Sequence, residues 1–234
     1  MDGLLLVHKP HGPTSHDVVQ AVRRKLRLQR IGHGGTLDPM AEGLLILLVG
    51  KATKWQQSVQ GHRKSYDAQI TLGAQTETAD ADGRIVRTAD VPALSVSVVE
   101  SVLESLLGEQ EQIPPAYSAI KVQGRHLYEW ARRGKPKTVA PRRITLFSLR
   151  LLALEGSRIA MHLDCSSGTY VRALAETIAQ QLGTVGHLSR LVRRSVGPWQ
   201  LEHARPLASW LDAPEEDIER ALLRPDTVAA PLCN

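Results

Sequence analysis

The sequence predicts an α+β protein with a mixed, largely antiparallel sheet flanked by helices. Residues 65–72 alternate between apolar and polar side chains, which is typical of a half-buried β-strand. Residues 98–107 instead carry their apolar side chains at helical spacing, and Gly108 follows them as a helix stop. Strands and helices follow one another irregularly, without the regular strand–helix–strand cadence that predicts a parallel sheet.

The N-terminal segment predicts a strand followed by a helix. Residues 4–7 form a short apolar run, and the Pro- and Gly-containing residues 8–13 end it. Thr14 or Ser15 can then cap a helix that continues to Lys25, because both side chains carry a hydroxyl that can accept from the first turn.

The rest of the chain adds strands, helices and one structured loop. Residues 32–43 contain four glycines and a proline and predict a loop, and the apolar run of residues 44–49 predicts a buried strand after it. Residues 158–165 predict another strand, and residues 170–182 an amphipathic helix. A last helix is expected near residues 215–223.

Composition fits a folded protein with a modest positive charge. Hydrophobic residues make up 42% of the 234 residues, which is enough to bury a core. Lys and Arg exceed Asp and Glu by 29 − 24 = 5. This excess fits a polyanionic partner and an ordinary soluble protein equally well.

Cysteine usage and hydropathy exclude several classes of protein. Cys165 and Cys233 lie far apart, which excludes a disulfide framework and a zinc-ligand spacing. No run of about 18 apolar residues is present, which excludes a membrane-spanning helix. The N-terminal residues lack the basic and apolar regions of a signal peptide. We therefore expect a cytoplasmic protein that does not associate with a membrane.

The glycine-rich segment GHGGTLDP, residues 32–39, presents an imidazole and a carboxylate on one loop. Its glycines allow tight bending or close approach to a ligand, and the proline after Asp38 favours an extended conformation for that residue. On spacing alone, the segment fits a structural Asx-type turn at least as well as a reactive loop.

Two further positions are candidates for chemistry. Arg172 lies in the first turn of the helix that follows CSSGTY, where a cation is slightly disfavoured. It therefore indicates an anionic partner, although an exposed helix-start arginine fits the same pattern. Tyr66 lies on the apolar side of its strand, and a core tyrosine with a satisfied hydroxyl fits that position as well as a functional one.

Each motif alone fits both a structural and a functional interpretation, and the order of the motifs along the chain decides between them. The chain carries, in sequence, GHGGTLDP, AEGLL, KSYDAQITLG, TETADADG, PPAYSAIKVQGRHLYEWARRG, CSSGTYVRALA and GHLSRLVRRSVGP. Together these blocks resemble the bacterial tRNA pseudouridine-55 synthase family, TruB, from residue 3 to about residue 200. The resemblance implies the pseudouridine synthase fold and the isomerisation of one T-loop uridine of tRNA. It also implies that neither a cofactor nor a metal takes part.

The resemblance assigns catalytic roles to three residues. Asp38 matches the essential carboxylate, and Arg172 matches the arginine that holds it ionised and oriented. Tyr66 matches the strand tyrosine that stacks on the target base, and its hydroxyl could assist removal of a proton from carbon. Whether Asp38 attacks C1′ of the sugar or C6 of the base stays open.

Further residues are implied to bind the substrate. His33 matches a histidine that occupies the space of the flipped nucleotides, Asp80 positions the substrate or the active-site network, and Leu188 lines the uracil pocket. Lys9 supports the site or contacts phosphate. Residues 121–145 match an insertion that grips the RNA stem–loop. Its expected RNA-binding residues are Arg125, Arg132, Arg133, Arg142 and Arg143, and a second basic cluster at Arg190, Arg193 and Arg194 is expected to continue this surface.

The resemblance also predicts domain organisation and partners. Residues 1–205 are expected to form the catalytic domain, and residues 206–234 a short tail. This tail is too short for the complete PUA-type RNA-binding module that many family members carry. The T stem–loop of tRNA is the expected partner, and no obligatory protein or guide-RNA partner is expected.

Three other functions compete with this interpretation. A guide-RNA-dependent synthase of the archaeal and eukaryotic type shares the catalytic blocks, but it needs protein partners. An RNA chaperone would remodel tRNA without chemistry. A glycosidase would need a second carboxylate beside Asp38, for which the motifs supply no clear candidate.

Overall fold

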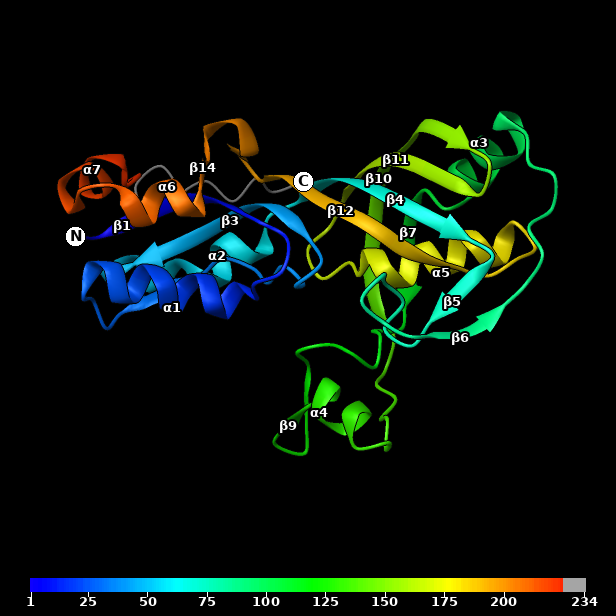
Figure 1. Ribbon diagram of the computed structural model, residues 1–234, viewed down its shortest axis with the longest axis horizontal. Helices are drawn as coiled ribbons and strands as arrows, with labels where there is room; N and C mark the ends of the chain where they lie inside the picture. The colour runs from blue at the N-terminus through cyan, green and yellow to red at the C-terminus, as the bar shows by residue number, and fades with distance from the viewer. Residues whose placement is uncertain (225–234) are drawn as a thin grey trace. The chain divides into compact units, whose positions relative to one another are not determined.

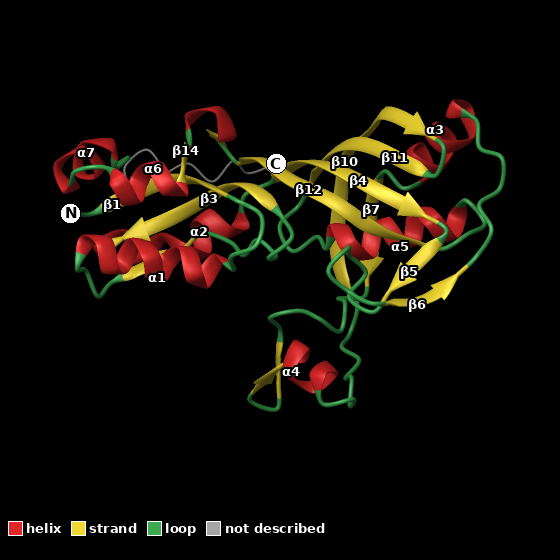
Figure 2. Ribbon diagram, in the orientation of Figure 1, coloured by secondary structure: helices red, strands yellow, loops and turns green. Residues whose placement is uncertain are grey.

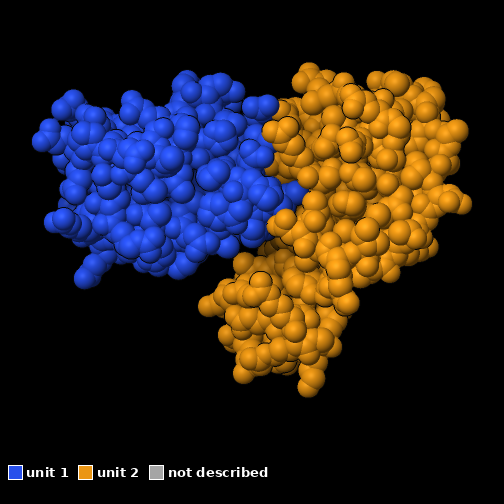
Figure 3. All heavy atoms as spheres, in the orientation of Figure 1, with its two compact units in different colours: residues 1–66, 192–234 blue, residues 67–191 orange. Residues whose placement is uncertain are grey.

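The structure is a computed structural model that describes residues 1–224. The chain folds into two compact units. Unit 1 comprises residues 1–66 and 192–234, and unit 2 comprises residues 67–191, as Figure 3 shows in two colours. The chain passes between the units inside strands β4 (Lys64–Leu72) and β12 (Gly186–Val196), so each of these strands contributes residues to both.

Unit 1 is built around a small mixed sheet with the order β14-β1-β3-β12-β4. Its other strands are β1 (Gly3–Lys9), β2 (Ile31–His33), β3 (Glu42–Val49), β13 (Trp199–Gln200) and β14 (Arg205–Pro206). β1 and β2 run antiparallel to β3, whereas β12 runs parallel to it. β3 is an unbroken apolar run because both of its faces are covered, and residues 43–49 are all buried.

The helices of unit 1 cover this sheet. They are α1 (Ser15–Leu26), η1 (Gly50–Trp55), α2 (Gln56–Gly61), η2 (Leu201–His203), α6 (Leu207–Asp212) and α7 (Glu215–Ala221). Thr14, rather than Ser15, caps α1, and it forms a capping box with Asp17. α6 packs against α1 and β1 (Figure 1). The Trp210 indole donates to the Leu6 carbonyl at 3.0 Å.

Unit 2 continues from the other ends of β4 and β12, with the order β12-β4-β11-β10-β7. Its remaining sheet strands are β7 (Gly108–Gln112), β10 (Arg142–Glu155) and β11 (Arg158–Cys165). β10 pairs antiparallel with both β7 and β11. A separate hairpin consists of β5 (Ala74–Thr76) and β6 (Ile85–Thr88). α3 (Val96–Ser105) packs against β10 and against α5 (Val171–Gln181).

The basic insertion of unit 2 has its own small secondary structure. A two-stranded sheet of β8 (Lys121–Val122) and β9 (Arg125–His126) leads into α4 (Leu127–Arg132). Figure 2 shows these elements joined to the larger sheet by two loop segments.

The α+β architecture with a largely antiparallel sheet is confirmed, and some boundaries differ from the prediction. β1 continues through Lys9 because β3 pairs with it over its whole length. The pattern of apolar residues in the sequence did not predict strand β12. Residues 206–224 pack onto unit 1, where β14 pairs with β1 and Trp210 is buried. The division of the chain after residue 205 stays a prediction. Within the described residues, no helix is long and apolar enough to cross a membrane.

Candidate active site

The loop of residues 34–41 carries Asp38 on an ordered backbone. The Gly34 N–H donates to the Ile46 carbonyl of β3 at 2.8 Å, and the Ala41 N–H donates to the Asp38 carbonyl at 3.1 Å. Asp38 itself is partly exposed. The Asp38 carboxylate therefore lies on an ordered loop, at a position that a substrate can reach.

Arg193 in β12 binds backbone carbonyl groups that come before and after Asp38 in the chain. Its Nε donates to the Leu44 carbonyl at 2.7 Å, while its two terminal nitrogens donate to the Thr36 and Gly35 carbonyls at 3.1 Å each. Arg193 is only 1% exposed. A buried guanidinium is tolerated only when its donors are paired, so the loop conformation and the placement of Arg193 depend on each other.

Arg193 also interacts with the proposed catalytic residues of unit 1. Its side chain is hydrogen-bonded to that of Tyr66 and interacts electrostatically with Asp38. Burial lowers the pKa of Arg193, and the interactions with Tyr66 and Asp38 oppose that shift. A guanidinium nevertheless stays protonated in proteins. A fixed positive charge therefore lies beside both the carboxylate and the phenol.

His33, at the end of β2, belongs to the same environment. Burial is the main cause that lowers the pKa of His33, and the positive charge of Arg193 adds to it. The imidazole is therefore neutral at neutral pH. A neutral, largely buried ring suits stacking or hydrogen bonding better than it suits an ionic contact with phosphate.

Lys9 anchors the other end of the Asp38 loop. Its side chain is fully buried, and its ammonium donates to the Pro10 carbonyl at 2.8 Å and to the Pro39 carbonyl at 3.2 Å. The Pro39 carbonyl also accepts from the Gly12 N–H at 2.9 Å. Of the two roles expected for Lys9, these contacts fit support of the site, and that role stays a prediction. Two buried cations thus hold the residues before and after Asp38.

Ser15 completes the anchoring from the first turn of α1. Its hydroxyl accepts from the Leu37 N–H at 2.8 Å and donates to the Leu37 carbonyl at 3.0 Å. Both polar groups of the residue before Asp38 are thereby paired by one side chain that is only 2% exposed.

Replacement of Ser15 by Ala is expected to lower the free energy of unfolding by about 1–3 kcal/mol, because two buried backbone groups lose their partner. Urea unfolding followed by circular dichroism would measure this loss. Ser58→Ala, at an exposed position of α2, is the matched control and should change stability by less than about 0.5 kcal/mol. Equal stabilities of the two variants would contradict the anchoring role.

In unit 2, Arg172 is held by a separate set of buried partners. Its Nε lies 3.6 Å from the Asp80 carboxylate, and its terminal nitrogens donate to the Thr78 and Tyr117 carbonyls at 2.8 Å each. Arg172 and Asp80 are 4% and 5% exposed, respectively. The anionic partner predicted for a first-turn arginine is present, and in this unit it is Asp80.

Leu188 lies beside the same turn. The Ala81 N–H donates to the Leu188 carbonyl at 3.0 Å, and the Leu188 N–H donates to the Ala79 carbonyl at 3.1 Å. Its side chain is fully buried. The structure thus brings Asp80, Arg172 and Leu188 together in unit 2, and Lys9, His33, Asp38 and Tyr66 together in unit 1. The pairing of Arg172 with Asp38 stays a prediction.

The insertion displays cations on aromatic faces. Arg125 lies over the Trp130 ring at 5.6 Å, Lys137 over the same ring at 5.1 Å, and Arg132 over the Tyr128 ring at 5.5 Å. These basic side chains are exposed. Cation–π contacts restrict their positions while leaving their charge accessible, which suits a polyanionic ligand.

The other expected RNA-binding residues are distributed differently. Arg133 is exposed directly after α4, whereas Arg142 and Arg143 are the exposed first residues of the sheet strand β10. Arg190 and Arg194 are also exposed. Arg193 was expected to share their surface, and this prediction is wrong, because alternate strand residues face opposite sides and Arg193 faces the core.

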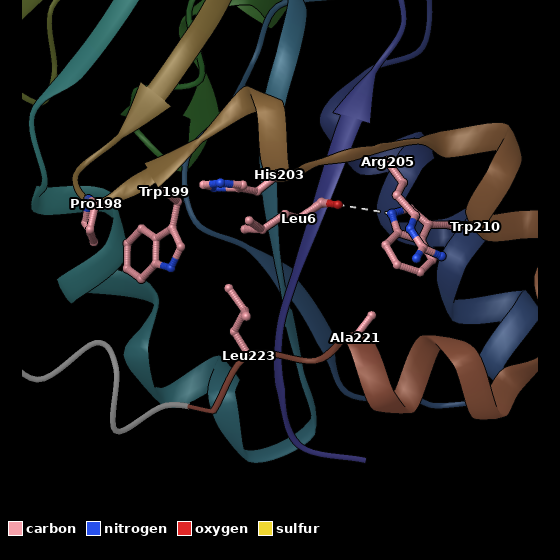
Figure 4. A pocket seen from close by; sticks show the side chains of 8 residues that line it. All are labelled: Leu6, Pro198, Trp199, His203, Arg205, Trp210, Ala221 and Leu223. Atoms are coloured by element: carbon pink, nitrogen blue, oxygen red, sulfur yellow. Dashed lines mark hydrogen bonds between the residues drawn. The ribbon is translucent and has the colours of Figure 1, made fainter.

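Unit 1 also contains a pocket of about 270 Å³ that Asp38 and Tyr66 do not line. Figure 4 shows Trp199, His203, Trp210 and Leu223 around it. The Arg205 guanidinium lies over the Trp210 ring at 4.9 Å. No cluster of three His, Cys, Asp or Glu side chains among residues 1–224 is arranged to hold a metal ion.

Arg193 and Ser15 are the site residues that sequence reasoning missed. The only hint for Arg193 was a charged pair within a short stretch, residues 191–196, that contains three apolar residues. Ser15 resembled an ordinary helix cap. The roles of both depend on partners far along the chain, which no local pattern reveals.

The chain is similar in sequence to a known protein family and to several of its members. Residues 23–171 match the TruB family pseudouridylate synthase N-terminal domain. The chain is 44% identical to tRNA pseudouridine synthase B of Aromatoleum aromaticum, over 96% of this chain and 72% of that protein. It is 43% identical to the protein of the same name from Opitutus terrae, over 99% of this chain and 95% of that protein.

A solved structure resembles the chain as well. A Cbf5-Nop10-Gar1 complex contains a chain that matches with a TM-score of 0.75 and 28% identity. The match covers 97% of this chain but only 61% of the solved one. Fold, motif order and sequence similarity agree, and this chain therefore belongs to the TruB family of pseudouridylate synthases.

Proposed function

We propose that this chain converts uridine 55 in the T-loop of tRNA into pseudouridine, with Asp38 as the catalytic carboxylate. Family membership and relatives named tRNA pseudouridine synthase B support the substrate. The observation that carries the proposal is the partly exposed Asp38 on a loop anchored by Arg193 and Lys9. A reacting group must be held in position before the substrate arrives, and this anchoring supplies that order.

The reaction breaks the bond between C1′ of the ribose and N1 of uracil, and forms a bond between C1′ and C5. C5 loses one proton and N1 gains one, so atoms balance and no electrons are transferred. The chemistry therefore needs no cofactor. The Asp38 carboxylate acts in its ionised form as nucleophile or base, and it interacts electrostatically with the nearby Arg193 guanidinium. The Tyr66 ring stacks on the base, and its hydroxyl assists proton removal from C5.

The target uridine must leave its stack in the folded loop, at a cost of roughly a few kcal/mol. His33 fills part of the space that the flipped nucleotides vacate, consistent with its neutral imidazole. Leu188, whose side chain is fully buried, belongs to the wall behind the uracil pocket. Asp80 holds that wall in place through its ion pair with Arg172.

The insertion binds the RNA backbone through its exposed basic residues. Arg125→Ala and Arg132→Ala are each expected to weaken tRNA binding and to reduce the salt dependence of the affinity by about one phosphate contact. Filter binding at several salt concentrations would measure both quantities. Arg220→Ala in α7 is the control, because Arg220 is exposed and pairs with Glu216 and Asp217. An unchanged salt slope in both insertion variants would contradict the RNA-binding role.

The activity test uses purified protein and an unmodified tRNA transcript, without guide RNA or another protein. Pseudouridine is mapped by carbodiimide modification and primer extension. A single new stop at the T-loop uridine is expected. Activity that appears only after a guide RNA and partner proteins are added would instead favour the guide-dependent type. Salt-sensitive tRNA binding without any stop would favour an RNA chaperone.

A further inference from the structure

We propose that Arg193 is a positioning residue of the isomerisation, which locks the Asp38 loop and the Tyr66 hydroxyl into one fixed arrangement. The proposal rests on the proposed function of Asp38 and Tyr66. It assigns this positioning role to a residue that was not among the predicted catalytic residues Asp38, Tyr66 and Arg172.

The contacts of Arg193 join three separate chain segments. The Gly35 and Thr36 carbonyls belong to the loop that leads into Asp38, and the Leu44 carbonyl belongs to β3. Tyr66 lies in β4 and is hydrogen-bonded to the same side chain. A planar guanidinium holds its donors in a rigid fork, so a shift of any one of these segments would break a buried hydrogen bond.

The backbone of Arg193 packs closely against Gly43, the residue that follows Glu42 at the start of β3. β12 pairs in parallel with β3 so that Arg193 lies opposite Gly43. Gly43 has a φ of +104°, and a Cβ at this position would lie 2.4 Å from the Arg193 carbonyl oxygen. Only glycine allows this conformation and this approach without strain. The strand pairing therefore places Arg193 within hydrogen-bonding reach of the loop carbonyls.

Burial distinguishes Arg193 from an ordinary RNA-binding arginine. At 1% exposure, its guanidinium is enclosed by protein, whereas its neighbour Arg194 is exposed. Phosphate recognition requires an accessible cation, so loss of Arg193 should affect the chemical step rather than tRNA affinity. This expectation separates a positioning role from a binding role.

The test compares Arg193→Met, Arg193→Lys and the control Arg24→Met, which removes an exposed charge from α1. Single-turnover rates at saturating tRNA give the rate of the chemical step, and filter binding gives the affinity. Arg193→Met is expected to lower the rate about 100-fold with little change in affinity, because a small misplacement of reacting groups costs about that much. Arg193→Lys keeps the cation but not the fork, and should recover part of this loss. Arg24→Met should react like the wild type.

A structural readout makes the test independent of activity. Hydrogen–deuterium exchange of peptides that cover residues 34–41 should accelerate in Arg193→Met and stay unchanged in Arg24→Met. If Arg193→Met does not fold, the same comparison uses Arg193→Lys. Wild-type exchange in the loop, or a wild-type rate in either folded Arg193 variant, would overturn the positioning role. A wild-type protein that forms no pseudouridine contradicts the proposed function instead, while the exchange data still decide whether Arg193 holds the loop.

Discussion

Replacement of Asp38 by Asn is expected to abolish pseudouridine formation, with a loss of at least about 10⁴-fold in rate, as for other enzymes that lose their reacting group. The amide keeps the size of the side chain but can act neither as an anionic nucleophile nor as a base. The loop should keep its conformation, because Lys9 and Arg193 bind its backbone carbonyls, which the substitution leaves in place. The measurement is the single-turnover yield of pseudouridine on a tRNA transcript.

Asp212→Asn is the matched control for this experiment, because Asp212 is an exposed aspartate of α6 in the same unit. It should react at the wild-type rate. Asp38→Asn should still bind tRNA with wild-type affinity, which separates catalysis from RNA binding and from any chaperone activity. Turnover by Asp38→Asn within tenfold of wild type would refute the assigned role of this carboxylate.

Replacement of Tyr66 by Phe is expected to lower the rate of the chemical step by about 10²- to 10⁴-fold, the usual range for a lost proton-transfer group. The ring remains and can still stack on the base, so tRNA affinity should change little. The lost hydroxyl also removes one partner of the buried Arg193 guanidinium, which adds a modest loss of stability.

Tyr128→Phe controls for the removal of a tyrosine hydroxyl elsewhere. Tyr128 lies in α4, where its ring supports Arg132, and a phenylalanine ring preserves that contact. This variant should be fully active. A double variant, Tyr66→Phe with Arg193→Met, should lose less than the product of the two single losses if both residues act on one step. Fully multiplicative losses would mean that Arg193 does not act through Tyr66.

Several elements were predictable because they have strong local patterns. The apolar run at residues 44–49, the alternation at 65–72 and the hydroxyl before α1 each specify one element, and β3, β4 and α1 are all present. The motif order identified Asp38 and Tyr66, and both lie around one buried cation. That cation is Arg193. The structure shows a bridge from Arg172 to Asp80 in unit 2, and the pairing of Arg172 with Asp38 stays a prediction.

The sequence by itself determined the α+β class, the family and the residues able to carry the chemistry, because periodicity and contiguous motifs are local properties. The tertiary structure decided which groups hold Asp38 in place. Arg193 and the Leu44 carbonyl are 149 residues apart, and they meet only because β12 pairs with β3. Ser15 and Leu37 likewise meet through the packing of α1 against β2. Such contacts depend on the pairing of remote segments, which no local pattern in a single sequence specifies.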